Sequence, residues 1–421
     1  MIVRARKSMH SVFLVLWALA MLCPQSSHGL PPVRSLVPWD SVQGDDEQNS
    51  ELDPYRMEWS VFPEVSYSTD DGFFFGAMGV VADYHPEYYP YQWRFEGQSS
   101  VSIRPDGKGN TEFPTHDHYL EFDLPNIVNG VRMRFRVAFQ RELRRYRGFG
   151  NRARPVPLDV SDRVGQYRFS SPLFRWNTRT PVTSKLFFIT QFGYQYVWSK
   201  VFSGSRLLDD SEGRNGSFVQ SVIHGLDPHH LLTTAMGFEY DSRNHETYPS
   251  AGMLHTFQVL GGMDVNASFG YGIASAQSRF YVSLYPQYLV LAIRAAVDMA
   301  FGQTPVYSLP VLGGEQVLRG VPEGFYHGTV RVLASAEFRS MFWHFNLWKH
   351  RFKFGLAAFF DSGRVFADYS AKPIPDGDKV GIRFGTGGGI RLGWGESLVF
   401  RFDAAWSPDD IGFYAGVGQS F

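Results

Sequence analysis

Two histidine pairs are the side chains in this sequence best suited to bind a metal ion. His116 and His118 are two residues apart, so they share one face of a strand, and His229 and His230 are adjacent. A zinc site needs three or four ligands, and neither pair has an evident third. We therefore interpret the first pair as exposed in an outer loop and the second as a loop end. We predict no metal site.

Three other patterns match known sites only in part. The acidic stretches 45–47 and 209–212 supply oxygen ligands that calcium accepts, but acidic loops are usually just solvated. The glycine-rich run 385–389 is not followed by a helix, so a bent or closely approached strand explains it better than a phosphate loop. No Gly-x-Ser-x-Gly nucleophile elbow occurs. We predict no catalytic residue, no cofactor and no enzyme activity, and a hydrolase built from dispersed Ser and His is the least supported alternative.

Arginines recur at alternate positions, which places them on one face of their strands. These residues are Arg132, Arg134, Arg136, Arg294, Arg331, Arg339, Arg383, Arg391 and Arg401. The acids that we assign to the same face are fewer: Glu142, Asp298, Glu337, Asp361 and Asp403. A hydrated lumen lined with both charges explains the pattern best, and a pore that favours anions is the alternative.

Composition limits the class of protein. Aromatic residues make up 16% of the 421 residues, 42 residues are glycine, and only 19% are charged. The net charge of −1 argues against a nucleic-acid partner. A single cysteine excludes disulfide scaffolds and sites with several cysteine ligands. These features favour a large β-rich protein.

The N-terminus is typical of an export signal. Basic residues precede an apolar run from Val12 to Leu22, and small residues follow before Leu30. We predict a signal peptide over 1–29, cleaved near Gly29, and a short disordered periplasmic leader over 30–56. No later stretch is apolar for long enough to form a membrane-spanning helix.

Alternation of period two is the strongest structural signal. Even-numbered residues are apolar in 329–339, odd-numbered residues are apolar in 131–139, and even-numbered residues are apolar in 398–406. Such strands have two unlike faces, as in a soluble sandwich or a transmembrane barrel. Their length, of about ten to fourteen residues, and the aromatic residues near their ends favour the barrel, since soluble strands average about five to six.

We predict an all-β fold, a transmembrane antiparallel β-barrel of sixteen strands over residues 57–421. The strands are expected at 57–68, 72–84, 91–104, 115–124, 130–144, 163–176, 184–199, 231–241, 251–263, 271–284, 287–301, 328–340, 351–362, 381–394, 397–406 and 410–421. An even number places both ends on the periplasmic side, with outer loops at 145–162, 200–230, 302–327 and 363–380. Phe421 is expected to end the last strand, at the seam where the barrel closes.

Two motifs resemble those of the bacterial surface-antigen superfamily, which contains barrel-assembly factors, translocation-and-assembly factors and two-partner secretion transporters. The first is similar to the family's lumen-plug loop and contains Leu318, Arg319 and Gly320. The second is similar to its aromatic-x-Asp-x-Gly signature and contains Phe359, Asp361 and Gly363. Weaker similarities extend over residues 57–421.

The resemblance implies that the sixth extracellular loop inserts into the lumen and that Arg319 pairs with Asp361. Alternation agrees independently, because it places Asp361 and Glu337 on the luminal face. An arginine fork matches a carboxylate and would hold the loop in place. Val321 departs from the family pattern, which prefers an aromatic residue there.

The resemblance also implies a function in inserting or translocating polypeptide or lipid at the bacterial outer membrane. Family insertases carry polypeptide-transport-associated domains before the barrel, and residues 30–56 are too short for one. A barrel-only chain would therefore contact outer-membrane lipid, and either substrate polypeptides or a separate periplasmic partner. In this mechanism the first strand (58–68) and the last strand (411–421) would separate at a weak seam. The alternative is a passive or structural barrel that its loop plugs.

Overall fold

The computed structural model describes residues 55–421 except 69–71, 86–90, 106–109, 129, 153–161, 246–247, 267, 286–287, 348–349, 370–380 and 395–397. The predicted signal peptide and residues 30–54 of the predicted leader lie outside the described residues. No helix among the described residues is long and apolar enough to cross a membrane.

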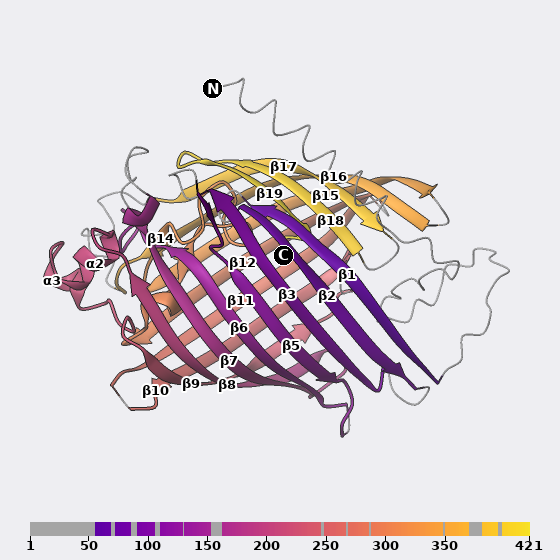
Figure 1. Cartoon of the computed structure of the whole chain (residues 1–421). Coiled ribbons are helices and arrows are strands. Elements are labelled where there is room, and N and C mark those ends of the chain that lie inside the picture. The colour runs from indigo at the N-terminus through magenta and orange to yellow at the C-terminus, as the bar shows by residue number, and fades with distance from the viewer. Residues whose placement is uncertain are drawn as a thin grey trace. The chain divides into compact units, whose positions relative to one another are not determined.

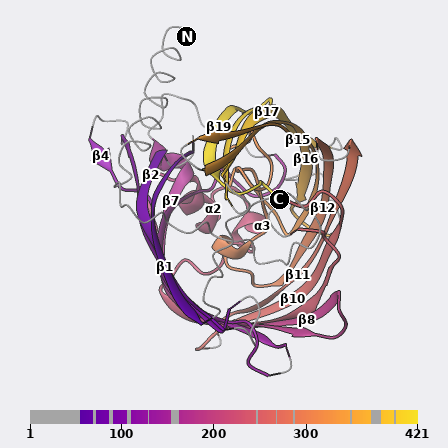
Figure 2. The ribbon, with the colours of Figure 1, turned by 90° about the vertical axis from the view of Figure 1, so that its right-hand side faces the viewer.

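Sixteen antiparallel strands form a closed barrel, so the predicted fold class is confirmed (Figures 1 and 2). They are β1 (Arg56–Ser68), β2 (Gly72–Tyr84), β3 (Trp93–Pro105), β5 (His116–Leu124), β6 (Arg132–Arg145), β7 (Gln166–Pro181), β8 (Leu186–Val201), β9 (His229–Asp241), β10 (Gly252–Asp264), β11 (Gly270–Tyr285), β12 (Leu289–Gly302), β15 (Val330–Leu347), β16 (His350–Phe366), β17 (Arg383–Trp394), β18 (Leu398–Trp406) and β19 (Ile411–Val417). Each pairs with the next, and β19 pairs with β1. The two-residue β4 (Thr111–Glu112) only extends β3.

The strands have an apolar outer face and a more polar inner face, as alternation predicts. On β16, Leu356 and Phe360 are 48% and 50% exposed. Phe359 and Asp361, the two sequence neighbours of Phe360, are only 4% and 1% exposed. The exposed face suits lipid, because side chains in a strand point alternately to the two sides of the sheet. Asp361 and Glu337 therefore lie on the inner face.

The long connections all leave one end of the barrel and contain the remaining elements. These are η1 (Asp162–Gly165), α2 (Arg206–Ser211), α3 (Ser217–Gln220), η2 (Val306–Ser308), β13 (Val311–Leu312) and β14 (Tyr326–His327). Ser205 caps α2 by accepting a hydrogen bond from the Leu208 N–H. Buried residues of several connections pack together: Tyr146, Phe149, Leu207, Val219, Ile223, Val306 and Leu309. This core fixes the connections relative to one another.

Several strand ends differ from the predicted ones. β7 continues to Pro181, five residues beyond its expected end, because the 182–185 turn is tight and Val182 donates its N–H to the Leu186 carbonyl. β15 continues to Leu347, beyond its expected end at 340, and β16 begins at His350. Their pairing continues past a shift in register between Met341 and Trp343. Alternation does not mark such ends, because a bulge changes the phase of the pattern.

The prediction that Phe421 ends the last strand is wrong. β19 ends at Val417, and Gly418 has a φ of +90°, which turns the chain away from the sheet. Phe421 is buried against Tyr281 and Ala292 on the inner face of β11 and β12. A positive φ, which glycine adopts easily, ends the extended strand at Gly418. The turn there carries Phe421 away from the seam.

Candidate functional site

The connection between β12 and β15 folds back on itself before it reaches Arg319. β13 pairs with β14, and inside this pair a tight turn is closed by hydrogen bonds from Leu318 N–H to the Gly314 carbonyl and from Gly314 N–H to the Val321 carbonyl. Leu318 and Val321 are fully buried in a cluster that includes Leu333 of β15. Apolar burial thus holds the turn against the inner face of the barrel.

Glycines allow the backbone of this turn to lie directly on the barrel strands. A Cβ at Gly385 of β17 would lie 1.9 Å from the carbonyl oxygen of Arg319, so only glycine fits there. Gly320 has a φ of +88°, and a Cβ there would lie 2.9 Å from the backbone of Trp406. The glycine run at 385–389 therefore lets the backbone of the turn approach β17 closely. A closely approached strand was one of the two explanations that the sequence suggested for this run, the other being a bent strand.

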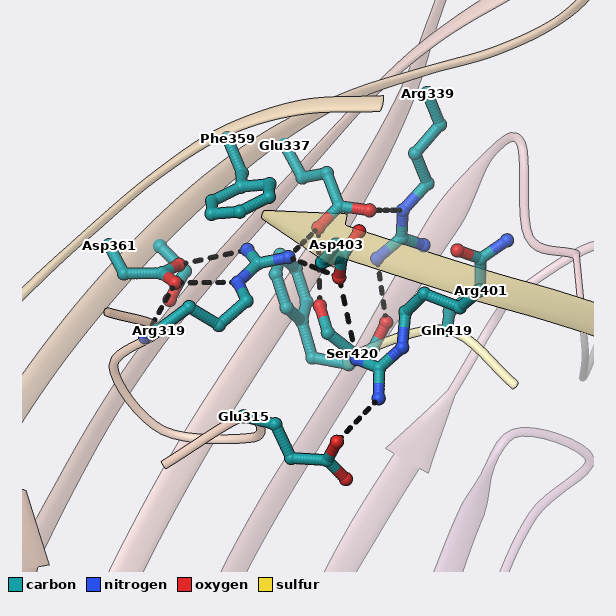
Figure 3. A network of polar contacts seen from close by, with 12 residues as sticks. Glu315, Arg319, Glu337, Arg339, Phe359, Asp361, Arg401, Asp403, Gln419 and Ser420 are labelled. Carbon is teal, nitrogen blue, oxygen red and sulfur yellow. Dashed lines mark hydrogen bonds and ion pairs between the residues drawn. The ribbon is translucent and has the colours of Figure 1, made fainter. Parts of the chain in front are cut away.

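Arg319 is the centre of a buried cluster of charges, in which side chains of three strands meet it (Figure 3). Its Nε and Nη2 donate to the two carboxylate oxygens of Asp361 on β16, at 2.7 and 3.1 Å. Its Nη1 lies 2.8 Å from Glu337 on β15 and 3.4 Å from Asp403 on β18. The guanidinium also lies 3.4 Å from the ring centroid of Phe359. The fork, the second carboxylate and the ring together satisfy the whole cation.

Three more arginines surround these carboxylates: Arg339, Arg391 and Arg401 (Figure 3). Arg391 bridges Glu337 and Asp403, at 3.1 and 2.5 Å. Arg401 reaches Glu315 of the turn at 3.4 Å, which adds a fourth carboxylate to the four arginines. Each arginine of the network is thus paired with at least one carboxylate, which offsets the cost of burying its charge.

The pKa of Arg319 follows from this environment. Burial by itself would lower the pKa of the guanidinium, but the carboxylates of Asp361, Glu337 and Asp403 outweigh it and raise the pKa above its ordinary value. Arg319 thus stays protonated at any pH at which the protein is folded. Its pairing does not depend on physiological pH.

Further contacts attach the turn to the barrel on both sides of Arg319. Arg294 of β12 donates to the carbonyls of Gln316 and Val317, at 2.7 and 3.1 Å. On the other side, Gly320 donates its N–H to the Tyr414 hydroxyl of β19 at 3.2 Å and accepts from the Ser407 hydroxyl at 2.8 Å. The turn therefore contacts the last strand of the barrel as well as its middle.

The structure brings most of the sequence-predicted site residues together. Arg319, Asp361, Glu337 and Phe359 are in direct contact, and Gly363 allows Leu312 of β13 to approach, since a Cβ there would lie 2.7 Å from Leu312 Cδ1. Leu318 and Gly320 shape the turn. Phe421 lies beside this cluster, where its main-chain oxygen accepts from Arg339 Nη2 at 2.9 Å.

Alternation assigns the network residues Arg339, Arg391, Arg401 and Asp403 to the inner face, but it gives them no partners. Sequence reasoning missed Glu315, Tyr414 and Ser407 altogether. The partner of Tyr414 and Ser407 is the backbone of Gly320, which only the folded turn brings near. A tyrosine on the inner face of a glycine-rich strand is the one local pattern that could have pointed to Tyr414.

The histidines are placed differently from the prediction. His116 and His118 lie at the start of β5 rather than in an outer loop, because the strand begins at His116. His118 contacts Ser99 through Nδ1 at 2.8 Å. His229 begins β9, where its Nε2 lies 2.6 Å from the hydroxyl of Tyr307 in the β12–β15 connection.

The acidic stretch at 209–212 also has structural partners. Asp210 accepts from the Tyr146 hydroxyl at 2.8 Å and pairs with Arg206 at 3.1 Å, and Asp209 pairs with Arg214 at 2.8 Å. Residues 45–47 lie outside the described residues. Within the part of the chain that the structure describes, no group of three or more His, Cys, Asp or Glu side chains is arranged to hold a metal ion.

Comparison with known proteins identifies the family and the fold. The model of the Omp85 superfamily domain matches residues 109–421. BamA from Haemophilus ducreyi lacking POTRA domains 1-3 is similar in structure, with a TM-score of 0.56 and 15% identity, over 86% of this chain and 70% of that one. CdiB from Escherichia coli has a TM-score of 0.52 and 12% identity, over 86% and 63%. No curated protein sequence matches the chain.

Proposed function

Since the chain belongs to the Omp85 superfamily, whose barrels are outer-membrane transport and assembly proteins rather than enzymes, we propose that it inserts or translocates polypeptide or lipid at the outer membrane. The moving part in this proposal is the seam between β1 and β19. In this proposal the β12–β15 connection, here called the plug loop (residues 303–329), closes the lumen and supports the seam strand β19 from inside, through its contacts with Tyr414 and Ser407.

The short seam is the observation that carries the proposal. β1 is paired with β2 along all 13 of its residues, whereas within the described residues its register with β19 comprises Tyr67 opposite Ala415 and Ser68 opposite Tyr414. A backbone hydrogen bond contributes about 1 kcal/mol net, so opening this seam costs far less than opening the β1–β2 pair. An edge strand with unpaired backbone groups is also able to accept a new strand.

Contacts of the plug loop support its role as a brace for the seam. Gly320 is hydrogen-bonded to Tyr414 on β19 and to Ser407 in the turn before it, and Tyr326 donates to Asp409 in the same turn at 2.9 Å. These contacts are all to the strand and turn that would move. Release of the plug loop would therefore remove the inner support of β19.

A disulfide lock tests the seam mechanism. Tyr67→Cys with Ala415→Cys joins outward-facing partners across the seam, and Ala276→Cys with Val297→Cys is the matched control in the β11–β12 pair. Background oxidation is low, because Cys23 is the only natural cysteine and lies in the predicted signal peptide. In the assay, each variant is expressed in cells depleted of the wild-type protein. Rescue is measured as the recovery of the outer-membrane proteins and lipids whose levels fall on depletion.

The seam lock should fail to rescue until a reductant is added, whereas the control lock should rescue throughout. If the oxidised seam lock rescues as well as the wild type, the seam does not open during function and the mechanism is wrong.

A passive barrel closed by its plug loop is the second candidate, and complete burial of the Arg319 network favours it. Conductance in planar bilayers separates the two candidates. A larger or noisier current in Arg319→Ala than in the wild type supports plugging, and identical traces contradict it. Rescue by the oxidised seam lock together with a changed current would favour the passive barrel.

A separate partner is also part of the proposal. The barrel would work with a periplasmic chain that supplies substrate-binding modules. Co-purification from native membranes tests this, with recovery of a barrel-associated periplasmic protein as the expected result. Full activity of the isolated barrel in liposomes would contradict it.

A further inference from the structure

Residues 418–421 leave the barrel sheet and run across its inner face. Gly418 still donates its N–H to the Val399 carbonyl at 2.8 Å, and its φ of +90° then turns the chain inward. Ser420 and Phe421 are both 7% exposed. The segment therefore occupies a definite place on the inner face rather than extending from the strand end.

Each residue of this segment after Gly418 has its own partner on the wall. Gln419 Oε1 accepts from Arg391 Nε at 3.2 Å. The Ser420 hydroxyl donates to Glu337 at 3.2 Å (Figure 3). The main-chain oxygen of Phe421 accepts from Arg339 Nη2 at 2.9 Å. These partners lie on β17 and β15, two strands on either side of β16, so the segment crosses several strands without pairing with any of them as a strand.

The ring of Phe421 sits in a small pocket. Tyr281 of β11 and Ala292 of β12 pack against it, and both are buried. The guanidinium carbons of Arg294 and Arg339 lie 4.6 and 4.9 Å from the ring centroid, within cation–π range. Ala292 leaves the room that the ring fills, since a larger side chain at that position would enter it.

Two buried guanidinium nitrogens at this pocket have no hydrogen-bond partner within the described part of the chain. They are Arg339 Nη1 and Arg294 Nε, on side chains that are 7% and 5% exposed. Buried donors are normally satisfied, so these two indicate a surface that accepts more polar groups than residues 418–421 offer.

We propose that this inner wall is a peptide-binding site, which takes an extended segment with an aromatic side chain following small polar residues. Residues 418–421 of the same chain fill it in this structure. The recognition elements are the ring pocket at Ala292, the Arg339 contact to the main chain, and the polar contacts of Arg391 and Glu337. The site does not depend on whether the barrel inserts or translocates its substrate.

The filling segment has an alternative place, which makes it displaceable. Continuing the register of Tyr67 with Ala415 and Ser68 with Tyr414 along both strands sets Phe421 opposite Val61 of β1. A tethered segment competes at an effective concentration of about millimolar. An added peptide therefore binds well only when the tethered segment is weakened.

Peptide binding to the full-length protein in detergent tests the proposal. The probe is a fluorophore-labelled, amidated peptide with the sequence of residues 415–421, followed by fluorescence anisotropy. Phe421→Ala should bind it at least about tenfold more tightly than the wild type, because the competing ring is gone. Adding Ala292→Leu to this variant should remove that gain, because the leucine fills the ring pocket.

Gly418→Ala provides an independent route to the same result. Its Cβ meets no atom within 4 Å, but alanine disfavours the φ of +90°, so the tethered segment leaves the wall more often while all its side chains remain. Binding should tighten about fivefold. A probe with alanine in place of phenylalanine should not bind either variant.

Heat-modifiable migration on gels shows which variants have folded barrels. Equal affinity of wild type, Phe421→Ala and Gly418→Ala would overturn the proposal. So would undiminished binding when Ala292→Leu is present, because the peptide would then be associating with detergent or another surface.

Discussion

Replacing Gly385 by alanine should release the plug loop without touching its charged residues. The new Cβ would lie 1.9 Å from the Arg319 carbonyl oxygen and 3.1 Å from its carbon. Both are backbone atoms, so no side chain can rotate away. The turn must therefore move back by about 1.3 Å to restore an ordinary contact distance.

This displacement is enough to break the cluster around Arg319. Its contacts to Asp361 and Glu337, at 2.7 and 2.8 Å, would lengthen to about 4 Å, beyond hydrogen-bond range. Disrupting a buried ion pair costs about 3–5 kcal/mol, so the released state of the loop should become about 10² to 10⁴ times more populated.

Hydrogen exchange measured by mass spectrometry reads this population. The amides of Arg319 and Gly320 are hydrogen-bonded to Asp361 and to Tyr414, so they exchange only when the turn leaves the wall. Their exchange should accelerate by about 10² to 10⁴ in Gly385→Ala, while peptides from β12 stay unchanged.

Gly388→Ala is the matched control on the same strand. Its Cβ points outward, and the nearest atom is 3.2 Å away, which a small adjustment accommodates. Exchange at Arg319 and Gly320 should then stay within about twofold of wild type. If Gly385→Ala folds and its turn exchanges no faster than that of Gly388→Ala, the close approach is not what seats the loop and the reasoning fails.

Three further predictions concern the plug loop and the N-terminus. Arg319→Lys should destabilise the docked loop by about 2–3 kcal/mol, because lysine keeps the charge but loses the fork; exposed Arg214→Lys should change exchange little, and equal effects would contradict the role of the fork. Burial, aided by Arg144, lowers the pKa of His327 to about 3. The contribution of neutral His327 to loop stability is therefore complete above the unfolded pKa of about 6.5 and is lost as the pH falls toward 3. The loss at pH 5 should be about 2 kcal/mol. The exchange of loop amides, corrected for intrinsic rates, should be faster at pH 5 than at pH 7 in the wild type, but not in His327→Phe. Equal corrected exchange rates at both pH values in the wild type would contradict this role of His327. N-terminal sequencing of the exported protein should begin at Leu30, and a chain that retains residues 1–29 would refute cleavage.

Alternation showed that the strands have two unlike faces, and strand length with the aromatic residues near the strand ends then favoured a barrel over a soluble sandwich. The same parity placed Asp361 and Glu337 on the inner face, where both now contact Arg319. Their pairing with a loop residue could not come from alternation, since it depends on how a long connection folds. It was expected from family resemblance alone.

The errors arise where backbone conformation overrides the pattern. Phe421 continues the apolar phase of the last strand in sequence, but the positive φ of Gly418 redirects it to the pocket of Tyr281 and Ala292. Likewise, Tyr414 and Ser407 bind backbone atoms of Gly320, and a sequence shows no complementarity for a backbone partner.

The glycines of β17 also bear on how the chain folds. Gly385, Gly387 and Gly389 face inward, so the middle of β17 offers no side chain on that side until Arg391. The turn around Arg319 lies against Gly385, and the ring of Phe359 lies against Gly387. β17 therefore completes its inner packing only once a segment more than sixty residues earlier has settled on it. Firm packing of β17 and seating of the loop should thus occur together, late in folding, because the contact joins segments far apart in the chain.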